Sequence, residues 1–306
     1  MKKKVLQKIF PALGTVNTVA IYSEYNPAIL EQVMQRVLDL HQLFSIFDPQ
    51  SEISRINENA GICSVPISED TFSVLSLAIA CAGETDGTFD ITTGTLSRLW
   101  RDAINSKRIP SDAEIEQHHL LGSIADLELD AKNRTAFLRQ AGIQLDLGGI
   151  AKGYAADEVQ RILKENHIEN ALINLGGTVI TIGKARHIGI QNPFQNTGEF
   201  VADVLLQNCA AVTSGAYERC FFSGGERYHH IIDPRSGKPS RSGLASVTLI
   251  GERAAELDAL ATGVFILGVK DSLPILHKHG IEAFFISDTG IVQITTGLQT
   301  RFTMCA

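Results

Sequence analysis

A glycine pair between an extended segment and a helix is the first feature of this sequence that could carry chemistry. Residues 146–154 read Asp-Leu-Gly-Gly-Ile-Ala-Lys-Gly-Tyr, and the pattern predicts a helix over residues 150–166 with Lys152 in its first turn. Free N–H groups at a helix start, the helix dipole and a lysine together suit a phosphate. The spacing matches neither GxGxxG nor GxxxxGKS/T, which excludes a dinucleotide fingerprint and a P-loop. The alternative is a plain turn with a solvated lysine.

A carboxylate within an apolar helix is the second feature. Asp258 and Thr262 lie four residues apart and therefore share one face of the helix predicted over residues 254–267. Their neighbours are mostly Ala, Leu, Val, Phe and Ile, and burying a carboxylate there is costly unless it is paired or bound to a cation. Carboxylate, hydroxyl and carbonyl oxygens suit Mg²⁺. The alternative is that Asp258 binds a backbone group or an arginine, while Thr262 bonds the carbonyl four residues earlier.

Two adjacent histidines form the third feature. Alternation along a strand predicted over residues 229–232 places His230 and Ile232 on one face and His229 on the other. A neutral histidine beside a bound phosphate could accept the proton of an attacking hydroxyl. Adjacent histidines that point to opposite faces are a weak metal signal, and a structural role is the alternative for either one.

A polar turn over residues 86–94 is the fourth feature. Phe89 could stack on a ring, and Asp90 and the threonines beside it could hydrogen-bond that ring, although such turns are common. The Thr-Ser-Gly sequence at 213–215 is not expected to supply a nucleophile, because it lacks the G-x-S-x-G pattern and a local histidine.

The composition narrows the class of protein. The chain has 306 residues, a net charge of −7 and 44% hydrophobic residues, which excludes general disorder and argues against a nucleic-acid partner. No uncharged apolar run of about 18 residues is seen, so no membrane span is expected. Five cysteines without a CxxC pair predict neither a disulfide framework nor a zinc site, and they suit a reducing compartment.

Helical and extended patterns alternate without a regular βαβ rhythm, which favours the α+β class. Helices are predicted over residues 27–44, 70–84, 150–166, 254–267 and 271–279. Extended segments are predicted at 16–22, 125–130, 135–140, 171–175, 179–182, 187–191, 200–206, 229–232 and 245–250, with two more at the C-terminus. Residues 101–120 are polar and are expected to form an exposed excursion. No linker interrupts the pattern, so residues 1–306 are expected to form a single domain.

Taken together and in order, these segments resemble the ApbE family of FAD:protein FMN transferases. The matching pieces are residues 12–15, 47–53, 87–94, 146–156, 171–177, 189–193, 211–215, 230–239 and 258–263. Each piece is modest alone, but nine of them in register span nearly the whole chain. The resemblance implies two T-fold-like α+β subdomains in one compact unit with mixed and antiparallel sheets, and a flavin in the groove between them.

The resemblance also implies an activity and a set of site residues. Members cleave FAD with Mg²⁺, transfer FMN to a Thr or Ser hydroxyl of an acceptor protein, and release AMP. His230 would be the catalytic histidine. Mg²⁺ would be held by Gly149 and Ala261, through their carbonyls, and by Asp258 and Thr262. FAD would be lined by Leu13, Phe47, Thr88, Phe89, Asp90, Asp146, Lys152 and Ile232.

Two residues depart from the family pattern. Members commonly have methionine where Leu13 stands and tyrosine where Phe47 stands; Phe47 keeps a ring for stacking and loses a hydroxyl. Lys8, Pro11 and Gly14 interrupt what would be the apolar core of a signal peptide, so a cytoplasmic location is expected. The acceptor would then be a cytoplasmic flavoprotein with a D-G-x-S/T-x-S/T-like motif, and a soluble reductase is expected.

Two other functions remain open from the sequence. One is a Mg²⁺-dependent FAD pyrophosphatase in which water replaces the acceptor hydroxyl. The other is a flavin-binding module without catalysis. The residues alone reach only a Mg²⁺-phosphate site in an α+β protein.

Overall fold

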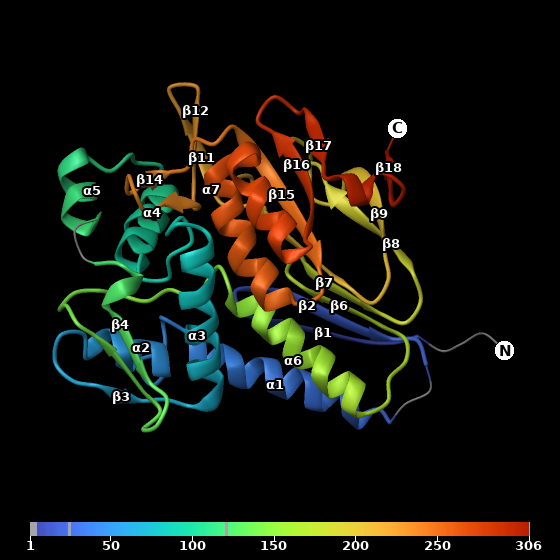
Figure 1. The fold of residues 1–306 in the computed structure, drawn as a ribbon, viewed down its shortest axis with the longest axis horizontal. Helices are drawn as coiled ribbons and strands as arrows, with labels where there is room; N and C mark the ends of the chain where they lie inside the picture. Colours follow the sequence, from blue (N-terminus) through green and yellow to red (C-terminus); the bar gives the residue numbers. More distant parts are fainter. Residues whose placement is uncertain (1–4, 24–25, 120–121, 306) are drawn as a thin grey trace.

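The chain builds its core on one eight-stranded antiparallel sheet (Figure 1). The computed structural model describes residues 5–23, 26–119 and 122–305. In spatial order the sheet contains β1 (Leu6–Ala12), β2 (Thr15–Ile21), β6 (Ala171–Leu175), β7 (Thr178–Ile182), β10 (Ala210–Gly215), β15 (Leu244–Gly251), β16 (Glu282–Ser287) and β17 (Val292–Ile294). Because β2 pairs with β6, strands from the two ends of the sequence share this sheet. The predicted α+β class and single compact unit are confirmed.

Strand β1 was not predicted, because Lys8 and Pro11 interrupt its apolar pattern. Phe10 and Ala12 are nevertheless buried, while Ile9 is 56% exposed, so the strand alternates as a half-buried strand does. β1 lies at the edge of the sheet, where a proline removes no ladder hydrogen bond from the centre.

Three long helices pack together beside this sheet and supply the main core (Figure 1). They are α1 (Ala28–Phe44), α6 (Ala151–Glu165) and α7 (Ala254–His279). Val33, Val37 and Leu40 show the predicted amphipathic spacing of α1 and are completely buried. α6 contacts both α1 and α7, so it links the glycine-rich turn at its start to the helix that carries Asp258.

Helix α7 combines the two helices predicted over 254–267 and 271–279. Gly268, with φ 79° and ψ 177°, interrupts the helical backbone between them. Within the described residues α7 is long and apolar enough to cross a membrane by length and composition alone, but 56% of its most apolar window is buried inside the protein. Residues such as Leu260, Val264 and Phe265 are fully buried in the main cluster, so α7 is a core helix.

A smaller group of elements comes from residues 52–84 and 124–138. It contains α2 (Glu52–Glu58), α3 (Glu69–Glu84), a one-turn 3₁₀ helix (Ile124–Asp126) and a three-stranded sheet of β3 (Val65–Pro66), β5 (Thr135–Leu138) and β4 (Leu127–Asp130). The predicted hairpin is confirmed, with Asp130 paired to Thr135 at its turn.

Helices α4 (Gly94–Ser106) and α5 (Asp112–His119) contradict the expectation that residues 101–120 form an exposed excursion. Trp100, Ala103 and Ile115 are buried in a separate cluster with Ile232. The spacing of Leu96, Trp100 and Ala103 gives α4 one apolar face, which the polar residues between them concealed. Residues 120 and 121 lie outside the described residues.

The remaining strands form three small sheets. β8 (Arg186–Gln191), β9 (Phe200–Leu206) and β18 (Phe302–Met304) make one, with a 3₁₀ turn (Thr296–Leu298) before β18; β11 (Cys220–Ser223) and β12 (Glu226–His229) make the second; β13 (Ile232–Asp233) and β14 (Lys238–Pro239) make the third. The strand predicted over 229–232 is therefore divided. His230 lies in a bend between β12 and β13, so simple strand alternation does not set its direction.

Candidate functional site

Close packing of the glycine-rich turn against α7 is the foundation of the candidate site. A Cβ at Gly149 would lie 3.1 Å from the Thr262 hydroxyl and 3.2 Å from the Phe89 ring. A Cβ at Gly153 would lie 2.2 Å from the carbonyl oxygen of Ala254, an impossible contact. Glycine is thus required at position 153, where α6 meets α7. The structure brings three sequence features together here: the glycine turn, the 86–94 turn and the face of α7.

Asp258 is a buried carboxylate, with 3% of its surface exposed. Its Oδ2 accepts a hydrogen bond from the N–H of Gly153 at 2.9 Å, and its Oδ1 lies 3.7 Å from Nζ of Lys152. Lys152 also donates to the carbonyl of Gly148 at 3.3 Å. The bond to Gly153 agrees with the alternative in which Asp258 binds a backbone group. Oδ1 of Asp258 nevertheless lies near Lys152, which contacts the glycine-rich turn at Gly148.

The oxygen atoms around Asp258 fit a hard divalent cation. Within the described ranges no hydrogen bond joins the Thr262 hydroxyl to the carbonyl of Asp258, and the hydroxyl lies instead beside Gly149. In the described part of the chain no group of three or more His, Cys, Asp or Glu side chains is arranged to hold a metal ion. A cation here would therefore rely on one carboxylate, a hydroxyl, carbonyls and water, which is the ligand set of Mg²⁺. Ala261 is completely buried in α7 and could contribute only its backbone.

Phe47, Arg101 and Asp146 form a chain of contacts at the surface. The Phe47 ring is 74% exposed and lies 4.9 Å below the Arg101 guanidinium. Arg101 donates to Oδ2 of Asp146 at 3.3 Å, and Oδ1 of Asp146 accepts from the N–H of Gly148 at 2.8 Å. The sequence prediction missed Arg101 because it lies in α4, and only the apolar face of that helix could have drawn attention to it.

The side chains of the 86–94 turn mainly hold the turn itself. Thr88 donates from its hydroxyl to the carbonyl of Gly263 at 3.2 Å. Asp90 accepts from the N–H and hydroxyl of Thr92 at 2.7 and 2.6 Å, and from the N–H of Ile124 at 3.0 Å. Burial raises the pKa of Asp90 although these hydrogen bonds oppose the shift. These two predicted flavin residues are therefore already engaged within the protein.

The two adjacent histidines have different surroundings. His229 is 4% exposed, donates from Nε2 to the carbonyl of Ser240 at 3.1 Å and accepts at Nδ1 from the N–H of Ile231 at 3.3 Å. Its ring lies edge-on to Phe265 with centroids 5.7 Å apart. Both ring nitrogens are satisfied, and burial lowers the pKa of His229 to about 4. His229 is a structural residue.

His230 keeps a buried Nδ1 without a hydrogen-bond partner among the described residues. Burial lowers its pKa to about 4, and the charges of Arg219 and Lys152 contribute in the same direction. Its N–H donates to the carbonyl of Arg219 at 3.2 Å. A neutral, unpartnered imidazole beside two cations is suited to take a proton next to a bound phosphate.

Arg219 was not predicted and connects His230 to the first turn of the chain. Its guanidinium lies 3.7 Å from the position of a Cβ on Gly14. Leu13, next to it, has a positive φ of 53° and donates its N–H to Nδ1 of His41 at 3.3 Å. The turn at residues 12–15, although distant in sequence, therefore lies near Arg219, which is bonded to His230. No motif marks Arg219, which is why sequence reasoning missed it.

Ile232 is the predicted site residue whose side chain is turned elsewhere. It is 8% exposed and packs with Trp100 and Ile115 in the α4–α5 cluster. Its backbone follows directly after His230 and Ile231. Any contribution of Ile232 to a ligand would therefore come from its backbone.

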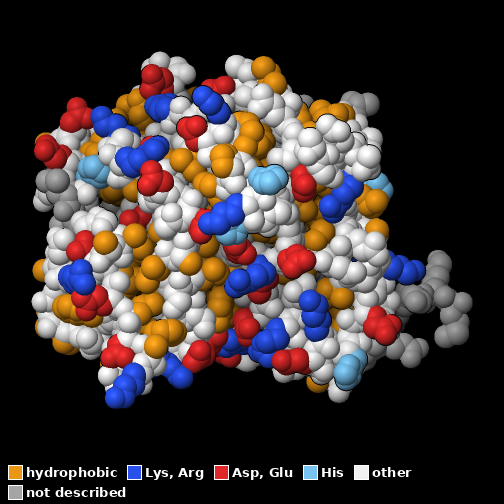
Figure 2. Space-filling model, in the orientation of Figure 1, with side chains coloured by type: hydrophobic (Ala, Val, Ile, Leu, Met, Phe, Trp, Pro, Cys, Tyr) orange, Lys and Arg blue, Asp and Glu red, His pale blue; other side chains and the backbone are white. Residues whose placement is uncertain are grey.

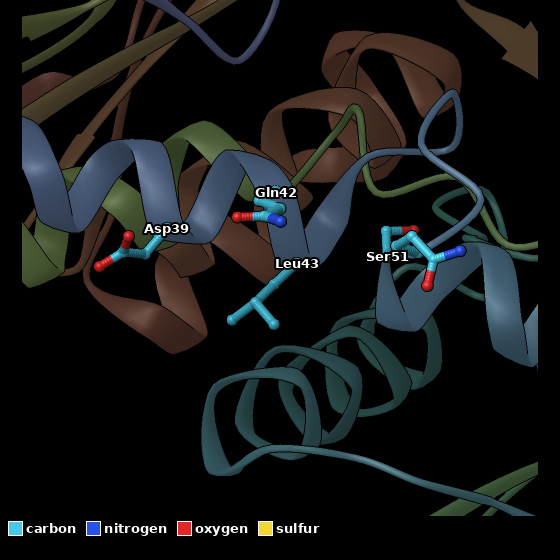
Figure 3. Close-up of a pocket in the computed structure, with 5 residues that line it drawn as sticks. Asp39, Gln42, Leu43 and Ser51 are labelled. Atoms are coloured by element: carbon cyan, nitrogen blue, oxygen red, sulfur yellow. The ribbon is translucent and has the colours of Figure 1, made fainter.

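Two surface hollows lie apart from these residues. One of about 330 Å³ is lined by Asp39, Gln42, Leu43, Gln50 and Ser51, where the end of α1 meets the loop before α2 (Figure 3). Another of about 320 Å³ lies where Tyr154 and Glu158 of α6 face Arg253. Neither contains a predicted site residue, so neither is taken as the site.

Comparison with known proteins identifies the family. The ApbE family pattern matches residues 13–285. A Klebsiella pneumoniae protein named FAD:protein FMN transferase is 34% identical over 291 residues, covering 95% of this chain and 92% of its own. A Treponema pallidum protein of the same name is 31% identical over 313 residues, covering 94% and 86%.

Solved structures give the same result for the fold. The ApbE protein of Thermotoga maritima superposes with a TM-score of 0.88 at 32% identity, covering 97% of this chain and 99% of its own. The flavinyl transferase ApbE of Pseudomonas stutzeri, in its apo form, has a TM-score of 0.84 at 25% identity, covering 99% and 98%. The protein described here belongs to the ApbE family.

Proposed function

We propose that this chain is an FAD:protein FMN transferase that uses Mg²⁺, moves the FMN half of FAD to a Ser or Thr hydroxyl of an acceptor protein and releases AMP. The observation that carries the proposal is the surroundings of His230. Its Nδ1 has no hydrogen-bond partner among the described residues, and the charges of Arg219 and Lys152 help burial to keep the imidazole neutral. Lys152 in turn lies 3.7 Å from Oδ1 of Asp258. The names of the relatives support the reaction class.

The group transfer balances with these residues. The acceptor hydroxyl oxygen bonds to the phosphorus of the FMN phosphate, the bond from that phosphorus to the bridging oxygen breaks, and AMP leaves with the bridging oxygen. The hydroxyl proton passes to the imidazole of His230. Lys152 and Arg219 offset the charge of the pyrophosphate, and that charge in return raises the pKa of His230 toward the physiological range.

Asp258, Thr262 and the carbonyls of Gly149 and Ala261 would hold Mg²⁺, which supplies charge withdrawal from the phosphoryl oxygens. The chain's own residues do the remaining work. The close contact of α6 with α7 fixes Lys152 relative to Asp258. Asp146 already accepts from the N–H of Gly148, so in this turn the N–H of Gly149 would meet an anion. Catalysis is then chiefly positioning and charge stabilisation.

The exposed Phe47 ring and its partner Arg101 are proposed to cover the flavin end of FAD. The acceptor is proposed to be a flavoprotein that presents its hydroxyl in a D-G-x-S/T-x-S/T-like motif, and a soluble reductase in the cytoplasm stays the prediction.

The test is incubation of the purified chain with FAD and MgCl₂, with and without a protein carrying the motif. A fluorescent acceptor band and AMP, both abolished by EDTA, are expected. AMP and free FMN without a labelled acceptor would indicate an FAD pyrophosphatase instead, and intact FAD throughout would indicate a flavin-binding module.

Two variants separate the histidines in the same assay. His230→Gln should lower the transfer rate by about a hundredfold or more, the contribution of a general base, while FAD still binds. Its matched control is His229→Gln, which should retain the transfer rate of the folded fraction. Equal transfer rates for His230→Gln and the unmodified chain would show that His230 is not the general base.

A further inference from the structure

The β11–β12 hairpin has one face on the protein and one face in solvent. On the inner face Phe221 and Tyr228 stack with centroids 5.3 Å apart, and Tyr228 stacks in turn on Trp100 at 6.1 Å. On the outer face Phe222, directly opposite Arg227 in the register, is 65% exposed. The hairpin projects beside α4 and α7 (Figure 1).

The outer face combines aromatic rings with a cation that has no carboxylate. The Arg227 guanidinium lies 5.3 Å from the Phe222 ring and 5.9 Å from the Phe194 ring, which is 47% exposed. Arg241 pairs with Glu226 at 2.9 Å, whereas no ion pair of Arg227 or Arg219 is found in the described part of the chain. We call Phe194, Phe222 and Arg227 the hairpin patch. Figure 2 shows hydrophobic and charged side chains side by side in this region.

The hairpin also offers an unpaired strand edge. β11 and β12 form a sheet of only two strands in the described chain, so β11 has one edge without a partner. A two-residue loop, Gly224–Gly225, closes the hairpin at the Ser223–Glu226 pair. In such a hairpin the next residue, Phe222, directs its backbone N–H and C=O away from β12. That edge could accept another extended segment.

The base of the hairpin is the candidate catalytic centre. Arg219 directly precedes β11, His230 directly follows β12, and the two are joined by a backbone hydrogen bond of 3.2 Å. Phe222 lies three residues from Arg219, about 10 Å along an extended strand. A segment added along β11 would therefore run from the hairpin patch to His230 within a few residues.

We propose that the hairpin patch and the outer edge of β11 bind the acceptor protein, as an extended segment with an acidic residue that delivers its Ser or Thr hydroxyl to His230. The inference rests on the proposed function and adds the place and mode of acceptor binding. Backbone pairing along β11 supplies register, the rings of Phe194 and Phe222 supply apolar contact, and Arg227 pairs with the acidic residue.

The experiment measures transfer rates against acceptor concentration, at saturating FAD and MgCl₂, for the unmodified chain, Phe222→Asp and Arg227→Glu. Each variant should raise KM for the acceptor at least about tenfold, the effect of losing one good contact, with FAD affinity unchanged in a flavin-fluorescence titration. The matched control is Ile62→Asp, which places the same charge on a 72% exposed residue outside the hairpin and should leave KM unchanged.

The outcomes distinguish the two proposals. Transfer by the unmodified chain with an unchanged acceptor KM in both hairpin variants would overturn the docking surface and leave the proposed function intact. Absence of transfer by the unmodified chain would overturn the proposed function and the docking surface with it. A change of oligomeric state in Phe222→Asp on size-exclusion chromatography would assign the patch to a second copy of the chain, against this proposal.

Discussion

The two sides of the candidate site are built in opposite ways. On the α6–α7 side Asp258 is 3% exposed, and a Cβ at Gly153 would meet the opposing backbone at 2.2 Å. On the hairpin side Phe222 is 65% exposed, and β11 has one edge without a partner strand among the described residues. Charge stabilisation of a pyrophosphate needs groups fixed before the substrate arrives, whereas a macromolecular partner must be able to reach the surface.

Removal of the carboxylate should break the rigid side most severely. Asp258→Ala takes away the one carboxylate proposed for Mg²⁺, so Mg²⁺-dependent AMP release should fall by about a thousandfold, the equivalent of several kcal/mol of lost charge stabilisation. The protein should remain folded, because a small side chain fits in the core of α7. AMP release at varied MgCl₂ and a thermal melt are the measurements. Full activity of the variant would place the cation elsewhere.

Acid should weaken the fold through the histidines that join the two sides. The pKa values of His229 and His230 are about 4 in the folded chain and near 6.5 in the unfolded chain. Above pH 6.5 both states are neutral and stability is complete; below it the unfolded state binds more protons, so stability falls until about pH 4. Each histidine should cost about 2 kcal/mol between pH 7 and pH 5.

Urea unfolding at the two pH values measures this loss, and His229→Gln provides the control. That variant is less stable at pH 7, since it disturbs the bonds to Ser240 and Ile231, but its loss between pH 7 and pH 5 should be smaller. An identical pH dependence with and without His229 would show that its imidazole is not held neutral by burial.

The close helix contact makes a prediction about stability alone. Gly153→Ala forces a methyl group against the backbone of Ala254 and should destabilise the fold by about 1–3 kcal/mol, the usual range for an overpacked core. The matched control is Gly83→Ala in α3, where no atom lies within 4 Å of the new Cβ. Helix propensity should stabilise that variant by about 0.5–1 kcal/mol. Thermal melts that do not separate the two variants would contradict the contact.

The same contrast explains what the sequence could reveal. Asp258 is predictable because a carboxylate in an apolar helix is costly and therefore informative, and Lys152 because a glycine pair precedes it. Arg219 and Arg101 carry no such local signal, since an arginine among polar residues is ordinary and only tertiary contacts bring these two to His230 and Phe47.

The secondary-structure elements also fall into those that the sequence predicted and those that it did not. The buried helices α1, α6 and α7 repeat apolar residues at helical spacing and were predicted well. Helix α4 was missed because polar residues separate its buried side chains Leu96, Trp100 and Ala103, and their partner Ile232 lies more than a hundred residues away. The break at His230 was missed because alternation describes only a continuous strand, and the turn to β13 depends on pairing with β14.

Arg101 gives the smallest expected effect and tests where the rigid α6–α7 side of the site ends. It contacts the exposed Phe47 ring and also donates to Asp146, which precedes the glycine-rich turn. Arg101→Ala removes the cation above Phe47 and a 3.3 Å contact to Asp146, so FAD affinity should fall about threefold to fivefold, the size of an exposed cation–π contact. Acceptor KM should not change. The control is Arg98→Ala, three residues earlier in the same helix, where the arginine donates to the side chain of Gln144. This variant should change neither FAD affinity nor acceptor KM. A large loss of transfer rate at saturating FAD would instead place Arg101 among the groups that act on the pyrophosphate, and would extend the rigid side of the site to α4.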